Sequence, residues 1–178
     1  MMTLAELLQK NKEAIVERWA DGVLATYGGE ASAAFKRQKD QFANPVGHSL
    51  RKGTRGIFET LLEGADAERI REHLREIVKV RAVQQFSASQ AVGFVFLLKE
   101  SVRAELGKAL SDSRLSSEVV KFEGQIDRIA LAAFDVFVEC REQVYELRVN
   151  EVKRRVSWVV DKMNKRDLDP DLARPNSE

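Results

Sequence analysis

The residues with the clearest capacity to bind a ligand lie in VRAVQQFSASQAVGFVFLLKE, residues 80–100. Arg81 follows Ile77 by four residues and shares its helical face, so we expect a partly buried guanidinium. A buried arginine needs a carboxylate or a bound anion, because an unpaired buried charge is costly. An internal salt bridge is the main interpretation. The alternative is an anionic ligand, with Gln84 and Gln85 adding hydrogen-bond donors.

Gly93 and His73 complete the candidate ligand site. Gly93 lies inside the most apolar predicted helix, where glycine costs about 1 kcal/mol relative to alanine. Close approach of a crossing helix is the plain explanation, as it is for Gly53 and Gly56, and a small apolar ligand is the alternative. His73, at the edge of an apolar stripe, has the chemistry of a single proximal haem ligand. A packing histidine is the simpler interpretation, so we expect no haem and no other cofactor.

The sequence contains none of the common catalytic motifs that we considered. GxSxG, HExxH and a phosphate-binding glycine loop are all missing from the sequence. Cys140 is the single cysteine, which excludes an internal disulfide and a multi-cysteine metal site, and its apolar neighbours indicate a packing role. One histidine on an apolar face cannot supply the three or four ligands of a protein metal site. We therefore predict no enzymatic activity and no metal.

Composition and charge are ordinary for a globular protein. A chain of 178 residues suits one domain with an appendage. Its 29 basic and 28 acidic residues nearly cancel, so no net field favours nucleic acid or an anionic membrane. The N-terminus MMTLAELLQKNKEA lacks the pattern of a signal peptide, and no span approaches the roughly 20 apolar residues of a membrane helix. We expect a cytoplasmic protein that binds neither nucleic acid nor membranes.

The elements that must position these residues are helices. Thr3 with Glu6, and Ser87 with Gln90, have the spacing of capping boxes. Asn44-Pro45 predicts another helix start, because proline lacks an amide that would be unpaired there. Residues 91–98 are apolar on every side, which predicts a central helix surrounded by other helices. Apolar residues at steps of three and four then predict helices over residues 3–27, 44–64, 66–85 and 90–110.

The last predicted helix runs from Ser116 to about Lys165, roughly 75 Å at 1.5 Å per residue. A domain of this size is narrower than that, so we expect the second half to project. That half has apolar residues at alternating steps of four and three, the pattern of two helices wound together. We predict pairing with a second copy as a homodimer; the alternative is a seam on the protein's own core. The predicted seam consists of Tyr145, Val149, Val152, Val156, Val159 and Met163.

The predicted organisation has three parts. Residues 1–143 form an all-α body, residues 144–166 form the heptad extension of the last helix, and residues 167–178 form a flexible tail. Parallel and antiparallel pairing of the heptad extension are both open at this stage, because valine at both seam positions does not specify an orientation.

Three segments resemble the RsbRD N-terminal domain family: FANPVGHSLRKGTRGIFETLLEG, IVKVRAVQQFSASQAVGFVFLLKESVR and VYELRVNEVKRR. The resemblance covers about residues 4–155 and implies the sensory half of an RsbT co-antagonist of bacterial stressosomes. It further implies a globin-like helical bundle that lacks haem and dimerises through its helices. In such proteins the final helix leads into a phosphorylatable STAS domain. Since about twelve residues follow the last predicted helix, we expect this chain to lack that domain.

Together these observations predict a non-enzymatic regulatory or sensory domain of the stressosome RsbR type, without a STAS effector domain, that binds a protein partner in a signalling pathway. The alternative is a globin-like sensor that holds haem or a small apolar molecule between the helices of His73 and Gly93. The signal, the partner and the presence of a ligand cavity stay open at this point.

Overall fold

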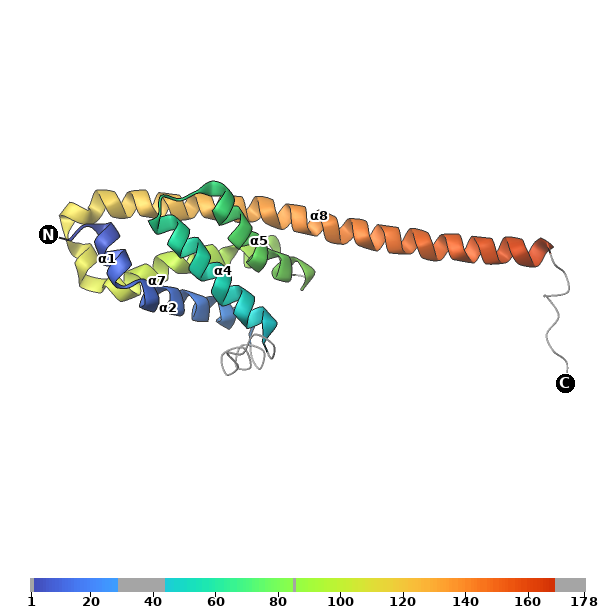
Figure 1. The fold of residues 1–178 in the computed structure, drawn as a ribbon, viewed down its shortest axis with the longest axis horizontal. Coiled ribbons are helices and arrows are strands. Elements are labelled where there is room, and N and C mark those ends of the chain that lie inside the picture. Colours follow the sequence, from blue (N-terminus) through green and yellow to red (C-terminus); the bar gives the residue numbers. More distant parts are fainter. Residues whose placement is uncertain (1, 29–43, 85, 169–178) are drawn as a thin grey trace. The chain divides into compact units, whose positions relative to one another are not determined.

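The computed structural model describes residues 2–28, 44–84 and 86–168. Regular structure within these ranges is helical throughout, and no strand occurs in them. The all-α prediction is confirmed, together with a long C-terminal helix. The helices are α1 (Leu4–Lys10), α2 (Lys12–Ala25), α4 (Pro45–Leu62), α5 (Ala67–Val83), α6 (Ala88–Val92), α7 (Leu97–Leu106) and α8 (Ser116–Leu168), with short 3-10 turns at Gly93–Val95, Gly107–Ser111 and Ser113–Leu115 (Figure 1).

The chain divides into two units, with the boundary between Cys140 and Arg141. The first unit contains α1 to α7 and residues 116–140 of α8. In the second unit, the described residues 141–168 are the remainder of α8. The apolar core of the first unit lies where α4 packs against α5 and α2, and where α2 packs against α7. Trp19, Phe58 and Phe94 are among its largest fully buried side chains.

The predicted helix starts are confirmed by their hydrogen bonds. The amide of Glu6 donates a hydrogen bond to Thr3 Oγ1 at 3.3 Å. In return, the amide of Thr3 donates to Glu6 Oε2 at 2.8 Å. Ser87 and Gln90 form the same reciprocal pair at the start of α6. Asn44 Oδ1 accepts from the amide of Gly47 at 2.7 Å at the start of α4. These local signals fix where the helices begin.

Two helices that the sequence predicts as continuous are interrupted. Asn11 separates α1 from α2 with φ −102° and ψ 14°, and its side-chain amide donates to the carbonyl oxygen of Leu7 at 2.8 Å. The helix predicted over residues 90–110 contains the 3-10 turn Gly93–Val95 between α6 and α7. Within that turn, the carbonyl oxygen of Phe94 accepts a hydrogen bond from the buried Trp19 Nε1 at 2.8 Å. A continuous α-helix would use this oxygen for its own i+4 amide.

Close approach of helices explains two of the three glycines. A Cβ atom placed on Gly53 would lie 2.6 Å from Ile77 Cγ1, and one on Gly56 would lie 2.5 Å from the ring of His73. The prediction of a close helix crossing is therefore confirmed for α4 against α5. It is wrong for Gly93, where no atom lies within 4 Å of an added Cβ, because the neighbouring segments leave that side of the 3-10 turn open.

We expect Gly53→Ala to lower the free energy of unfolding by about 1–2 kcal/mol. Overpacking of a core contact typically costs about 1–3 kcal/mol, and the higher helix propensity of alanine offsets about 1 kcal/mol of that. Gly124→Ala is the matched control, because it lies within α8 with no atom within 4 Å of an added Cβ. The control is expected to gain up to about 1 kcal/mol. Urea denaturation followed by circular dichroism measures both, and equal stabilities would contradict the close crossing.

Candidate functional site

Arg81 lies in the last turn of α5 and is fully buried, with none of its surface exposed. Its Nη1 donates to the carbonyl oxygen of Gln90 at 2.9 Å. Its Nη2 donates to Thr26 Oγ1 at 2.8 Å and to the carbonyl oxygen of Val23 at 3.3 Å. No carboxylate of the described residues pairs with it, so the predicted internal salt bridge is wrong. Oxygens near the C-terminal end of α2 replace the carboxylate, because helix ends carry partial negative charge.

Three aromatic rings surround the same guanidinium. The rings of Tyr27, Phe86 and Phe94 each have their centroid 5.1 Å from Arg81 Cζ, a distance at which the electron-rich ring faces attract a cation. We call Arg81 and these three aromatic residues the Arg81 cage. Tyr27 and Phe86 also contact each other edge to face, with centroids 5.2 Å apart. The cage therefore joins the end of α2, the end of α5 and the 3-10 turn after α6.

Burial sets the protonation behaviour of the cage. It lowers the pKa of Arg81 from its usual value, although the interaction with Tyr27 opposes this shift. Burial also raises the pKa of Tyr27, and the charge of Arg81 opposes that shift in turn. Arg81 Nε is buried without a hydrogen-bond partner among the described residues. The arrangement suits a structural role for this charge, because both terminal nitrogens of the guanidinium donate hydrogen bonds to oxygen atoms.

The predicted ligand site is only partly assembled. Gln84 is exposed at the C-terminal cap of α5, and Gln85 lies outside the described residues. Gly93 precedes Phe94 of the cage, but His73 lies eight residues before Arg81 on α5, roughly 12 Å along the helix axis. The His73 ring instead lies against Gly56 of α4. The three aromatic residues of the cage are not predictable from the sequence, because no regular spacing links Tyr27 to Phe86 or Phe94.

No group of three or more His, Cys, Asp or Glu side chains within residues 2–28, 44–84 and 86–168 could hold a metal ion. Cys140 is buried, and burial raises the pKa of its thiol, which disfavours the reactive thiolate.

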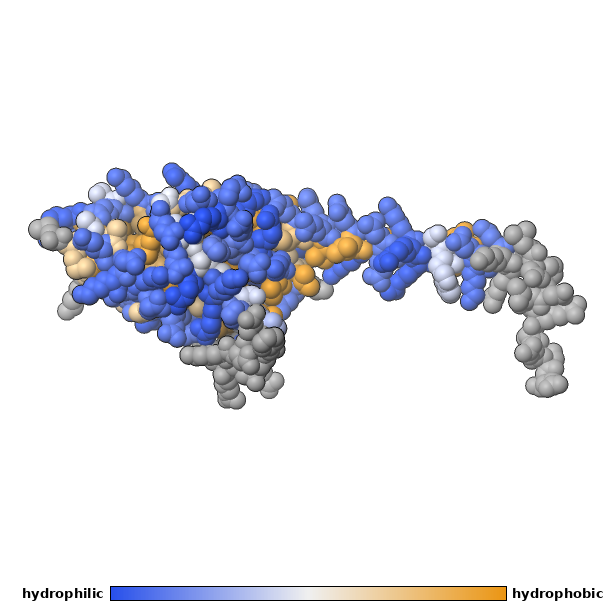
Figure 2. Space-filling view, in the orientation of Figure 1, coloured by the Kyte–Doolittle hydropathy of each residue, from blue (hydrophilic) through white to orange (hydrophobic). Residues whose placement is uncertain are grey.

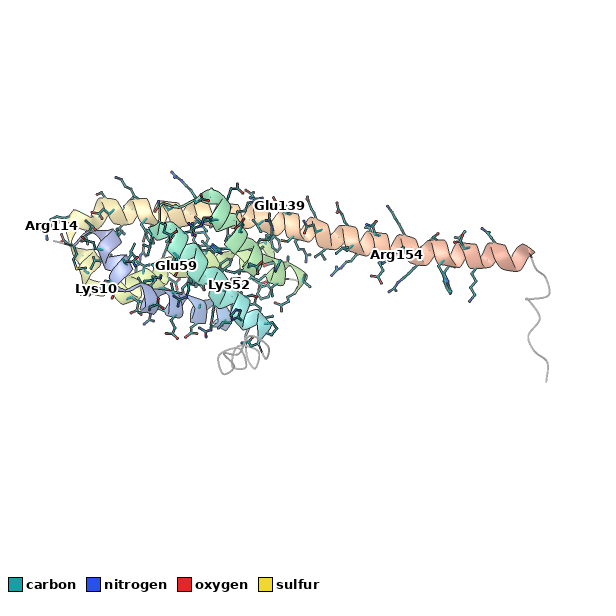
Figure 3. The ribbon with its side chains drawn as sticks, viewed as in Figure 1. Lys10, Lys52, Glu59, Arg114, Glu139 and Arg154 are labelled. Carbon is teal, nitrogen blue, oxygen red and sulfur yellow. The ribbon has the colours of Figure 1, made fainter. Side chains whose placement is uncertain are left out.

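An ionic contact joins α5 to α8 within the first unit. Glu139 of α8, labelled in Figure 3, lies in the first unit. It accepts hydrogen bonds from Arg71 and from Arg75, the latter at 3.4 Å from Arg75 Nη2. Both arginines belong to α5, the helix that carries Arg81. A displacement of α5 at the cage would therefore act on the part of α8 that ends the first unit.

The six predicted seam residues are exposed on the second unit. Between 47% and 61% of the surface of each side chain is accessible, although all six are apolar or aromatic. Leu131 and Val138 of the first unit are also exposed, and they precede Tyr145 by two heptads and one heptad. A row of water-exposed apolar side chains at heptad spacing is typical of a helix that pairs with another helix.

Comparisons with known proteins agree with the resemblance noted in the sequence. The family model described as RsbT co-antagonist protein rsbRD N-terminal domain matches residues 13–152. No curated protein and no solved structure matches the chain. The globin-like part of the fold prediction therefore stays a prediction. Within the described ranges, none of the helices combines the length and the apolar character needed to cross a membrane.

We expect Arg81→Lys to lower the free energy of unfolding by about 2–3 kcal/mol. Lysine keeps the charge but loses the planar group that stacks on aromatic rings and donates in several directions, and hydrogen bonds from a charged group contribute about 1.5–3 kcal/mol each. Arg128→Lys is the matched control on the exposed face of α8, where changes stay within about 0.5 kcal/mol. Urea denaturation measures the free energy of unfolding of both variants. If Arg81→Lys lowers this free energy no more than Arg128→Lys does, the structural role of the cage is refuted.

Proposed function

This chain belongs to the RsbT co-antagonist protein rsbRD N-terminal domain family, and on that premise we propose that it is a non-enzymatic regulatory domain that acts through protein contacts in stressosome signalling. The proposal places it in the cytoplasm, as a homodimer joined along α8. The observation that carries it is the exposed apolar seam of the second unit. Pairing would remove six apolar side chains from water, which is the main favourable contribution to association.

Charges beside the seam favour a parallel pair. Arg141, Arg148, Arg155 and Lys162 follow one another at intervals of seven, so they form one row beside the apolar stripe. An antiparallel pair would place this basic row against the same row of the second copy. A parallel pair instead places Arg141 near Glu146 of the second copy, which is a favourable contact. Like charges then lie near each other only where Arg148 approaches Lys153 of the second copy. Repulsion is therefore smaller in the parallel arrangement.

The route by which a signal would reach the seam begins at the cage. Arg81 at the end of α5 contacts three rings from separate segments, so a ligand that moved one of these rings would also act on α5. Arg71 and Arg75 on the same helix bind Glu139 of α8. We therefore propose that an anionic or small apolar ligand near Arg81 and Gly93 shifts α5 and changes the helix pairing. The proposal requires no haem, because His73 lies against α4 rather than in the cage.

We expect Val152→Glu with Val156→Glu to convert a dimer into a monomer, because paired seam positions would then bury carboxylates without partners. Multi-angle light scattering measures the molar mass. Asn150→Glu with Ser157→Glu is the matched control, since it adds the same two charges at exposed positions off the seam. A wild-type mass equal to one chain, or a seam variant with the mass of its control, would remove the seam from the proposal.

We expect Tyr145→Cys, in a Cys140→Ala background, to form a disulfide between copies under mild oxidation. A parallel pair brings position 145 next to its equivalent, within the Cα separation of about 4.4–6.8 Å that a disulfide requires. Non-reducing electrophoresis measures the cross-link. Mixing the Tyr145→Cys protein with a Met163→Cys protein is the control. Preferential cross-linking between positions 145 and 163 would show an antiparallel pair and refute the orientation.

A further inference from the structure

An apolar groove follows the first turns of α8 in the first unit, apart from the Arg81 cage and from the seam. One lobe of about 650 Å³ lies between α1, the end of α4 and α8. A second lobe of about 390 Å³ lies between the corner that joins α4 to α5 and α8. Leu61, Gln125 and Arg128 line both lobes, so the two lobes adjoin.

The walls of the groove are apolar and include small residues. Leu4 and Leu8 of α1 face Phe122 of α8 in the first lobe, and Val120 at its rim is 69% exposed. Figure 2 shows apolar atoms between α1 and α8 on this face of the unit. Along α8 the groove extends over residues 118–132, roughly 21 Å at 1.5 Å per residue. This length corresponds to about four turns of a helix.

Two cations without an acidic partner border the groove. Lys121 and Arg128 are seven residues apart on one face of α8, and no ion pair joins either of them to another described residue. Several other basic residues of the unit are paired, for example Arg103 with Glu123 at 2.6 Å. Glu118 contributes a carboxylate to the lining of the groove, and this carboxylate accepts a hydrogen bond from the amide of Leu4 at 2.8 Å. The groove is thus apolar inside and positive at its edge.

We propose that this groove binds an amphipathic helix of a partner protein, with apolar side chains on one face and carboxylates beside them. Apolar side chains of such a helix would fill the two lobes. A carboxylate between those side chains would lie next to Arg128, which lines both lobes. Apolar contact supplies affinity in this mode of recognition, and charge complementarity supplies specificity. The inference rests on the proposed function, since it names the kind of partner that such a regulatory domain binds.

Charge disfavours the other obvious occupant, a second copy of α8. The row Arg141, Arg148, Arg155 and Lys162 beside the apolar seam is basic, so it would be repelled by Lys121 and Arg128. The seam and the groove therefore select different partners: the seam selects a second copy, and the groove selects an acidic helix.

The test is a selection from displayed helical segments of fourteen residues. Leucine is fixed at steps of three and four, and the flanking positions are randomised among Glu, Lys and Gln. The targets are the full chain, the Lys121→Glu with Arg128→Glu variant, and Lys52→Glu as control, an exposed cation in the first half of α4 (Figure 3). We expect enrichment of Glu on the wild type and the control, and enrichment of Lys on the double variant.

Fluorescence anisotropy with the enriched peptide then measures affinity. The double variant is expected to weaken binding by about tenfold, the scale of two surface ion pairs, and Lys52→Glu is expected to leave it unchanged. No charge preference, or the same preference on the double variant, would overturn the proposal. Binding of free palmitate that depends on Lys121 and Arg128, without peptide enrichment, would also overturn it in favour of a fatty acid.

The result is separable from the proposed function. The double variant changes only the first unit, so light scattering is expected to show an unchanged dimer. A dimer without peptide selectivity refutes the groove alone, and a monomeric wild type that selects acidic helices refutes the seam alone.

Discussion

A positive charge buried without a carboxylate is the constraint on which the fold of the first unit depends. The Arg81 guanidinium is stabilised only where main-chain oxygens, a hydroxyl and aromatic faces converge on it. Those groups come from the end of α2, the start of α6 and the turn that follows. Since leaving the charge unsatisfied would cost several kcal/mol, these segments must meet at the end of α5. The interruption of the helix at Gly93–Val95 belongs to the same junction, because it places Phe94 over Arg81 and its carbonyl oxygen at Trp19.

The α5 helix connects this junction to the rest of the unit. Its close crossing with α4 at Gly53 and Gly56 leaves little freedom for sliding, since side chains of α5 fill the space that a Cβ would occupy. Its arginines bind Glu139 on α8. One helix therefore carries the buried charge, a close helix crossing and the ionic link to α8. This concentration of contacts makes α5 the element through which a change at the cage would be transmitted.

Under the proposed function, two surfaces of the same helix bind different partners. Apolar side chains at heptad spacing provide the area for pairing of α8, and the basic row beside them favours a parallel orientation. The groove near the start of α8 has a positive edge, which discriminates against that basic row. Under the proposed function, opposite charge requirements at the seam and at the groove would let one helix discriminate between two kinds of partner.

The sequence by itself determined the helix starts, the all-α class, the long last helix and the family. Thr3 with Glu6 and Ser87 with Gln90 act over three residues, and the heptad pattern repeats every seven, so local spacing contains the information. Only the tertiary structure decided the partners of Arg81, which lie up to 58 residues away in the chain, the break at Gly93–Val95 and the groove beside Arg128. These three features depend on which helix surfaces come into contact in the folded chain. The periodicity of apolar residues along one helix does not specify which other helix packs against it.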